Sequence, residues 1–356
     1  MQIALLTDTH FGARGDDQAF DRFFEKFYID TFFPTLEKKG INQIIHLGDV
    51  FDRRKYINYI TLQNCKRYFF DETKKRNIKV YGIVGNHDVY FKNTNNVNSP
   101  GLLLEQYNNI VFYSGPIEMS WDGCSILLLP WINSGNYNES MEAIKISKSP
   151  VCFGHLELAG FQMYKGQLND HGFDPKLFER FDLVCSGHFH HRSNSGNVTY
   201  LGNPYEITWA DYDDRRGFHI FDTSTRELEF IVNPYNIFYK IVYNDSENDQ
   251  YKAIHAHTDL SYLKGGYVKV IVKNKTNPLW FDMFIDRLEK QQLSDMQVVD
   301  DHLNLDMEND HDIIDQAEDT LSILSKYCEQ FDDKVDKERL DSLLRSLYNE
   351  AINLEN

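Results

Sequence analysis

The hydrophobic and polar positions in the first part of the chain follow two alternating patterns. Short, almost wholly apolar runs over residues 2–6, 42–47 and 78–84 predict buried strands. Between them, residues 17–39 and 57–76 repeat apolar side chains every three or four positions, which predicts helices. The order strand, helix, strand, helix, strand is typical of a layered α/β fold built on a parallel sheet.

Shorter apolar runs separated by polar turns continue through the middle of the chain. We expect strands at 110–113, 124–129, 151–153, 181–185, 198–201, 217–221 and 228–232. Because the late strands follow one another with turns between them, we expect a second sheet that faces the first.

The pattern changes after Asn233-Pro234, and we expect the main domain to cover residues 1–235. Residues 236–300 should form a small α/β module, since the alternating run 267–273 predicts a strand and Asn277-Pro278 is typical of a helix start.

The last part of the chain, residues 301–356, is expected to contain an acidic linker and two amphipathic helices. Residues 295–319 hold ten acidic side chains and no lysine or arginine, which is typical of a solvated linker. The helices either pack on their own chain or bind the helices of another protein, and the pattern leaves both interpretations open.

Composition limits the classes of function. The net charge of −17 argues against a uniformly basic nucleic-acid-binding protein, but bound divalent cations would still let an acidic nuclease approach phosphate. Five scattered cysteines, none in a CxxC pair, favour a reducing compartment. No apolar run approaches about 18 residues, so we expect no membrane segment and a cytoplasmic location.

Polar residues with metal-binding side chains follow five of the apolar runs. Because the carboxyl ends of parallel strands meet at one edge of a sheet, these residues can converge although they are far apart in sequence. Gly85 is expected to let the chain turn sharply after its strand. The candidate set is Asp8, His10, Asp49, Asn86, His87, His155, His188 and His190.

The chemistry of this set points to divalent metal ions. Carboxylates, imidazoles and an amide oxygen, without thiolates, suit hard or borderline cations. The set is too large for one ion, and two ions about 3.5–4 Å apart would need a shared carboxylate. No serine or cysteine nucleophile motif or phosphate-binding glycine loop competes with this interpretation.

The order of these motifs resembles the calcineurin-like metallophosphoesterase family. The sequences Asp8-Thr9-His10, Gly48-Asp49, Gly85-Asn86-His87-Asp88, Gly154-His155 and Gly187-His188-Phe189-His190 match its five-part pattern. Extended matches around these motifs, and Arg215-Arg216-Gly217-Phe218, are similar to SbcD-type recombination and repair nucleases, including those of T4-like bacteriophages. The resemblance implies a four-layer α/β fold, a β-sandwich flanked by helices.

The resemblance also implies roles for single residues. Asp8, His10, Asp49 and His190 would hold one manganese ion, and Asp49, Asn86, His155 and His188 would hold the other, with magnesium as the alternative metal. His87 matches the catalytic histidine, which acts on the leaving oxygen. Some relatives carry a further histidine on the substrate side where this chain has Asp52.

Partners are likewise implied by the resemblance. The small module resembles a capping domain that shapes access of DNA, and the C-terminal helices resemble the segment that docks on an SMC-like coiled-coil ABC ATPase. Family members form homodimers, here through 57–75 and 97–108, and would assemble with the ATPase as a heterotetramer. Candidate DNA contacts are Arg53, Arg54, Lys92, Arg192, Arg215 and Arg216, although each could equally be an ordinary solvated cation.

Three hypotheses follow from the sequence. The first is a manganese-dependent DNA exonuclease or endonuclease, the catalytic half of a recombination and repair complex. The second is a phosphomonoesterase or small-molecule phosphodiesterase with the same ligands. The third is a non-catalytic scaffold on the same fold, which we rank last because no matched ligand is missing.

Overall fold

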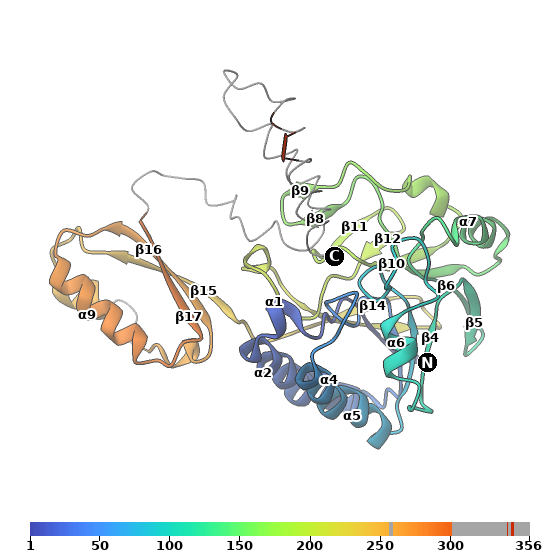
Figure 1. Ribbon diagram of the computed structural model, residues 1–356, viewed down its shortest axis with the longest axis horizontal. Coiled ribbons are helices and arrows are strands. Elements are labelled where there is room, and N and C mark those ends of the chain that lie inside the picture. Colours follow the sequence, from blue (N-terminus) through green and yellow to red (C-terminus); the bar gives the residue numbers. More distant parts are fainter. Residues whose placement is uncertain (256–258, 301–339, 341–342, 345–356) are drawn as a thin grey trace. The chain divides into compact units, whose positions relative to one another are not determined.

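The computed structural model of the protein describes residues 1–255, 259–300, 340 and 343–344. The chain divides into two compact units, and the described residues 1–207, 211–255 and 259–300 belong to the first. Apart from residues 340, 343 and 344, the predicted acidic linker and C-terminal helices of 301–356 lie outside the described residues. The fold below is that of the first unit (Figure 1).

Two six-stranded sheets form the centre of this unit. The first has the order β14 (Leu228–Val232), β13 (Gly217–Asp222), β1 (Gln2–Leu6), β2 (Gln43–His46), β3 (Lys79–Ile83) and β4 (Ile110–Tyr113). The second has the order β11 (Ser193–Ser195), β12 (Val198–Tyr200), β10 (Leu183–Gly187), β7 (Val151–His155), β6 (Cys124–Leu129) and β5 (Ile117–Trp121). The expected second sheet is present, but of the late strands 198–201, 217–221 and 228–232 only the first joins it, as β12. The other two, β13 and β14, extend the first sheet because β13 pairs with β1.

Parallel strands occupy the middle of each sheet. In the first, β1 to β4 are parallel, and β13 and β14 add antiparallel strands at the β1 edge. In the second, β6, β7, β10 and β12 are parallel. Consequently the carboxyl ends of β1, β2 and β3 share one edge of the first sheet, and those of β7 and β10 share one edge of the second.

The inner faces of the two sheets form one apolar core. Leu5 and Ile45 of the first sheet pack in the same cluster as Leu128 and Phe153 of the second, and all four are at most 1% exposed. Burying a side chain of this size contributes about 1.5–3 kcal/mol. This shared core fixes the edges of the two sheets relative to each other, and hence the loops that carry the candidate residues.

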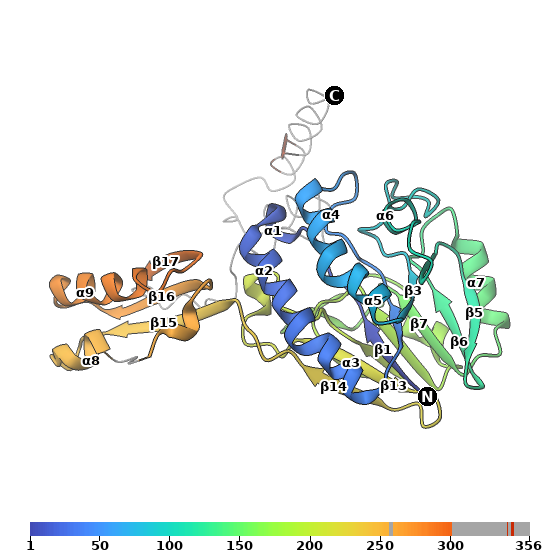
Figure 2. The ribbon, with the colours of Figure 1, turned by 90° about the horizontal axis from the view of Figure 1, so that it is seen from below.

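Helices cover the outer sides of the sandwich. The helical segments of the sandwich are α1 (Ala13–Asp16), α2 (Gln18–Phe27), η1 (Tyr28–Phe32), α3 (Phe33–Lys39), α4 (Tyr59–Cys65), η2 (Lys66–Phe70), α5 (Asp71–Lys75), α6 (Ser99–Leu103), α7 (Tyr137–Ile146) and η3 (Pro175–Phe178). The short segment η4 (Trp209–Asp211) begins at residues that do not belong to this unit. Figure 2 shows α2, α4 and α5 together on one side and α7 beside β5 and β6. Among the described residues, none of the helices is long and apolar enough to cross a membrane.

The two long helices predicted from the apolar spacing are present, but each is interrupted. The segments η1 and η2 are π-helical turns of five residues between α-helical pieces. Both π-helical turns are rich in buried aromatic side chains, including Tyr28, Tyr68 and Phe69.

A separate three-stranded parallel sheet forms the module after residue 235. Its elements are β15 (Phe238–Asn244), α8 (Gln250–His255), η5 (Ser261–Leu263), β16 (Tyr267–Asn274), α9 (Pro278–Glu289) and β17 (Asp295–Asp300). The strand order β15-β16-β17 follows the chain, so right-handed connections place both helices on one face. The predicted strand and helix are confirmed, whereas β15 and α8 were missed, and residues 295–300 at the start of the acidic stretch form β17. The domain boundaries at 235 and 300 remain predictions.

A short hairpin of β8 (Gln162–Tyr164) and β9 (Gln167–Leu168) completes the described strands. It is joined to the second sheet through the His191 amide, which donates to the Met163 carbonyl at 3.2 Å. The hairpin therefore lies against the loop that follows β10.

Candidate metal centre

The loops after β1 and β2 are held together by backbone hydrogen bonds. The Asp8 amide donates to the Gly48 carbonyl at 3.0 Å, and the His10 amide donates to the Asp49 carbonyl at 3.1 Å. This pairing continues the parallel sheet beyond the last strand residues, so Asp8, His10 and Asp49 are placed side by side.

Four of the predicted ligands have left-handed backbone conformations. The φ angles are 49° at Asp8, 41° at His10, 56° at Asp49 and 85° at His188. Non-glycine residues rarely adopt this region, and such strained conformations gather at functional sites. The strain here is concentrated on residues whose side chains meet in one place.

Glycines allow the loops to approach closely, which corrects the expected role of Gly85. Its φ is not positive, so it does not supply a left-handed turn. Instead, a Cβ atom at Gly85 would lie 2.2 Å from the Asp49 Oδ1 atom, and one at Gly187 would lie 2.0 Å from the Thr7 Oγ1 atom. Both positions therefore need glycine for space.

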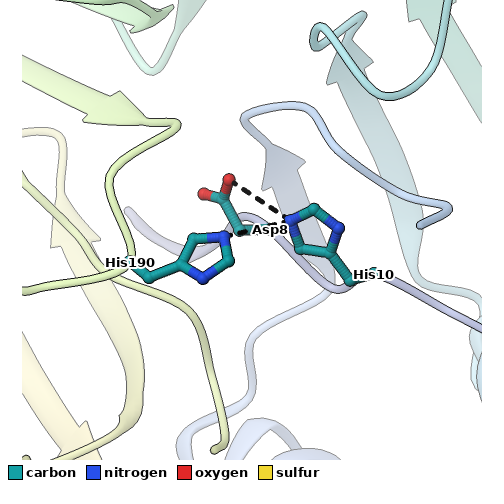
Figure 3. Close-up of side chains that lie close together, drawn as sticks. All are labelled: Asp8, His10 and His190. Carbon is teal, nitrogen blue, oxygen red and sulfur yellow. Dashed lines mark hydrogen bonds and ion pairs between the residues drawn. The ribbon is translucent and has the colours of Figure 1, made fainter. Parts of the chain in front are cut away.

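Asp8, His10 and His190 form the first group of candidate ligands (Figure 3). One ligand atom from each lies within 4.8 Å of the others, and all three residues are buried. The Nε2 atoms of His10 and His190 are 3.1 Å apart, and the His10 Nε2 atom is 4.0 Å from an Asp8 oxygen. Two imidazole nitrogens facing each other beside a buried carboxylate are what a shared cation would stabilise, so the group fits a metal ion.

Asp49, His155 and His188 form the second group, again within 4.8 Å. The Asn86 Oδ1 atom lies 2.8 Å from the His155 Nε2 atom and 2.9 Å from the His188 Nδ1 atom, so it joins this group. The Asp49 Oδ2 atom lies 3.4 Å from His155 Nε2 and 3.8 Å from His10 Nε2. Asp49 therefore stands between the two groups, as a bridging carboxylate would.

The ring orientation of His155 is fixed from behind. Its Nδ1 atom is 2.7 Å from the Leu47 carbonyl oxygen, a contact that requires the proton on Nδ1. In the neutral ring, the Nε2 lone pair then faces Asp49 and Asn86 and is available to a metal.

His87 lies beside both groups with a different set of contacts. Its backbone amide donates to the Asp49 Oδ1 atom at 2.8 Å, and its Nδ1 atom is 2.6 Å from the Asp52 carbonyl oxygen. The ring is half-buried and 4.8 Å from the ring of His10. His87, Asp52 and His10 also offer ligand atoms within 4.8 Å of one another. With Nδ1 held by the carbonyl, Nε2 is the atom left to act on a substrate.

The buried charges shift one another's pKa values. Burial would raise the pKa of Asp49, but His155 and His87 hold it well below its usual range. Burial would lower the pKa of His10, yet Asp52 and Asp49 raise it to about 9. Burial, with the neighbouring His155, lowers the pKa of His188 to about 3. Without a metal, the cluster thus combines an ionised Asp49 and a neutral His188, both ready to bind a cation, with a His10 that holds its proton and would release it when a metal binds.

Asp88 supports the centre, a role that the sequence did not reveal. Its carboxylate accepts hydrogen bonds from the amides of Asp49, Val50 and Gly85, each at 2.9 Å. Burial, with the neighbouring Asp49, raises the pKa of Asp88 to about 7. Its place at the end of the motif Gly85-Asn86-His87-Asp88 could have marked Asp88 as a residue of the site. The motif does not show, however, that its carboxylate binds backbone amides of neighbouring loops.

The candidate DNA contacts occupy different environments. Lys92, Arg192 and Arg215 are exposed, whereas Arg53 pairs with Asp16 at 2.8 Å and the Arg54 Nε atom donates to the Val89 carbonyl at 3.1 Å. All five remain hypotheses.

Arg216 is only 5% exposed, and its guanidinium donates to the His190 carbonyl, Asn203, Asp211 and Asp214. Its partners are all within the chain, so we do not retain it as a DNA contact.

Comparison with known proteins supports a phosphoesterase centre. The model of the calcineurin-like phosphoesterase family matches residues 1–192, which include all eight candidate residues. The chain is also 39% identical over 236 residues to exonuclease subunit 1 of enterobacteria phage T4, covering 65% of this chain and 68% of that protein. The resemblance expected from the sequence is therefore confirmed.

Solved structures give a more distant likeness. An archaeal phosphodiesterase is 16% identical, with a TM-score of 0.33, and the match covers 65% of this chain and 99% of that one. GAP50, the anchor in the inner membrane complex of Plasmodium, is 11% identical with a TM-score of 0.41, over 66% of this chain and 90% of its own. The assignment to a family therefore rests on the sequence matches.

Proposed function

Because the chain belongs to the calcineurin-like phosphoesterase family, we propose that it is a divalent-metal-dependent DNA nuclease that hydrolyses phosphodiester bonds. The observation that carries the proposal is the meeting of two ligand groups around Asp49. Similarity to a T4 protein named as an exonuclease subunit favours DNA over a small phosphate ester.

We assign the residues to two ions. Asp8, His10 and His190 would hold one, Asn86, His155 and His188 would hold the other, and Asp49 would bridge them. Oxygen and imidazole donors suit manganese, with magnesium as the alternative. When bound, two such ions supply Lewis-acid activation of the phosphodiester and of water.

His87 is the proposed general acid. Its Nδ1 atom is 2.6 Å from the Asp52 carbonyl, which fixes the ring and leaves Nε2 to carry the proton that passes to the leaving oxygen. The half-buried position gives that atom access to substrate. Exposed Lys92, Arg192 and Arg215, with partly exposed Arg53 and Arg54, would contact phosphates.

We further propose that the chain works as a homodimer with an SMC-like coiled-coil ABC ATPase, in a heterotetramer for DNA recombination, repair and end processing. Two observations support a partner: the T4 relative is named as a subunit, and a net charge of −17 would benefit from a basic surface on another chain. The module of 236–300 would cap the site and guide DNA.

The test is DNA cleavage in manganese by the wild-type protein, His87→Ala and the matched control His171→Ala, which replaces an exposed histidine. End-labelled single-stranded and double-stranded DNA are used, with and without the ATPase, and bound metal is measured for each protein. We expect His87→Ala to lose at least about 100-fold in rate while keeping two ions, and His171→Ala to match the wild type.

Two outcomes would contradict the proposal. If the wild type cuts no DNA, even with the ATPase, yet hydrolyses a phosphomonoester, the chain is a phosphomonoesterase. If His87→Ala loses its metal as well as its activity, His87 is a ligand and the proposed proton donor lies elsewhere.

A further inference from the structure

One aromatic side chain stands beside the second ligand group. Trp131 follows β6, the strand next to β7, and its ring centre is 5.1 Å from that of His188 and 6.1 Å from that of His155. None of the candidate ligands follows β6. The end of β6 therefore places an indole ring, and none of the candidate ligands, next to the second ligand group.

The exposure of the surrounding residues shows which side of the centre the indole borders. Asp8, His10, Asp49, His155 and His190 are buried and form its base. Asn86, His87 and His188 are half-buried and form its open side, where substrate must enter. Trp131 is also half-buried and contacts His188, so it belongs to this open side.

The backbone of Trp131 is held firmly at both ends. Its amide donates to the Val84 carbonyl at 2.8 Å, directly before the Gly85-Asn86-His87 turn. Its carbonyl accepts from the side-chain amides of Asn95 and Asn136, each at 2.9 Å.

The asparagine side chains that bind the Trp131 carbonyl are themselves held by a further hydrogen bond. The Asn133 side chain donates to the Asn95 Oδ1 atom at 2.7 Å, which ties the asparagine-rich loop 93–98 to the segment after Trp131. The loop therefore helps to hold the backbone from which the indole reaches His188, and such preorganisation is useful for positioning a substrate.

We propose that the indole of Trp131 is the stacking surface for the nucleobase that adjoins the scissile phosphate. This proposal rests on the proposed nuclease function and adds a determinant of substrate preference. Base-on-indole stacking accepts every base, because each has an aromatic face, and is therefore suited to a nuclease without sequence preference. It would also favour nucleotide diesters over diesters that lack a base.

The experiment compares two substrates in manganese. Thymidine p-nitrophenyl phosphate, tested as both its 3′ and 5′ ester, carries a base, and methyl p-nitrophenyl phosphate does not. The proteins are the wild type, Trp131→Ala, Trp131→Phe and the control Trp280→Phe, which changes a half-buried tryptophan in α9.

We expect Trp131→Ala to lower kcat/KM for the thymidine ester about tenfold, mainly through KM, and to leave the methyl ester within twofold. Trp131→Phe keeps an aromatic face and should retain most of the preference. A binding measurement without turnover accompanies it: oligothymidylate should quench indole fluorescence in the wild type and in Trp280→Phe, but far less in Trp131→Phe.

The outcomes separate the two proposals. If the wild type hydrolyses neither diester nor DNA, the nuclease function fails. If the wild type hydrolyses both esters and Trp131→Ala lowers both equally, Trp131 only supports His188 and the stacking proposal is overturned. An unchanged ester preference in Trp131→Ala overturns it as well.

Discussion

Asp52 connects two histidines of the centre through different groups. Its carboxylate oxygen lies 3.3 Å from the His10 Nδ1 atom, while its backbone carbonyl lies 2.6 Å from the His87 Nδ1 atom. A carboxylate behind a ligating imidazole orients the ring and increases its basicity. The aspartate that replaces a histidine of some relatives is therefore well placed to support metal binding by His10.

Asp52→Asn tests this role, because it removes the charge and leaves the backbone carbonyl for His87. We expect manganese affinity to fall by about 10- to 100-fold, as seen when such supporting carboxylates are lost. Calorimetric titration with manganese measures it, beside Asp213→Asn as a control on an exposed carboxylate. Equal affinities for the wild type and Asp52→Asn would show that His10 needs no such support.

Arg216 is the buried charge that holds the loop of His190. Its guanidinium reaches the His190 carbonyl, and it lies 3.0 Å from Asp211 and 2.8 Å from Asp214. Arg216→Ala would remove the arginine charge that the Asp211 and Asp214 carboxylates both contact and leave these buried and half-buried groups less compensated, so we expect a loss of about 3 kcal/mol in the free energy of unfolding. Urea denaturation measures this loss, and Arg215→Ala, which changes the exposed arginine next in the chain, should lose less than about 0.5 kcal/mol. Equal losses for the two variants would contradict the role.

For single residues, the sequence predicted the candidate metal ligands better than it predicted the residues that hold their loops in place. Asp8, Asp49 and His155 were recognisable because each follows an apolar run, and parallel strand ends converge by geometry. The roles of Asp88 and Arg216 depend on backbone groups of other loops, which no local pattern encodes. Arg216 resembled a surface cation because its carboxylate partners become neighbours only in the fold.

Among the elements, the long helices show where apolar spacing stops being informative. The spacing predicted helix over 17–39 and 57–76, and it could not predict η1 and η2. Aromatic rings of the two π-helical turns pack against each other. The ring centre of Tyr28 lies 5.8 Å from that of Tyr68, in a stacked arrangement, and 4.7 Å from that of Phe69. Because this packing joins distant segments, tertiary contacts explain the extra residue in each turn better than local preference does.

Glu206 joins two elements at the start of the small module. Its Oε2 atom accepts from the amides of Ile237, at 2.7 Å, and Phe238, at 3.0 Å, where β15 begins. Burial raises the pKa of Glu206 from 4.5 to about 7. The folded protein therefore holds this proton more tightly than the unfolded chain does.

This shift predicts a pH dependence of stability. The contribution of Glu206 is fully present below about pH 4.5 and is lost as pH rises through about 7, by at most about 3 kcal/mol. Glu206→Gln keeps an oxygen that accepts from both amides but cannot ionise. We expect the wild type to lose stability relative to Glu206→Gln between pH 4.5 and 7.5, measured by urea denaturation. A difference that stays constant over this range would contradict the raised pKa.

For the whole molecule, the sequence predicted the layers better than their connections. Four parallel strands with helices between them follow from the apolar pattern of the first half, and Ile3, Leu5 and Ile45 indeed face the shared core. The hairpin β8–β9 was invisible because its strands have two or three residues. β15 was missed although Phe238, Ile241 and Tyr243 are buried in it, because their spacing follows neither a strict alternation nor one apolar run.

The described surface carries large exposed apolar side chains on two neighbouring segments. Tyr59 is 87% exposed and Leu102 is 69% exposed, with Tyr56 and Phe91 at 64% and 49%. Figures 1 and 2 both place α4, which begins at Tyr59, beside α6, which contains Leu102. Exposed apolar side chains of this kind are typical of a protein interface. Tyr59 and Leu102 lie in the segments 57–75 and 97–108 expected to form the homodimer, whereas Tyr56 and Phe91 lie just outside them.

Tyr59→Glu and Leu102→Glu test this dimer by placing a negative charge in the expected interface. In a two-fold interface each substitution occurs in both copies, so two unpaired carboxylates would be buried at once. We expect the wild type to sediment as a dimer at micromolar concentration and both variants as monomers, with at least about a hundredfold weaker association. Leu279→Glu, at a position 65% exposed on α9, is the matched control and should stay dimeric. If Leu279→Glu is monomeric while Tyr59→Glu and Leu102→Glu remain dimeric, the prediction is wrong. The same charge would then be tolerated on α4 and α6 but not on α9, and the interface would be assigned to the small module.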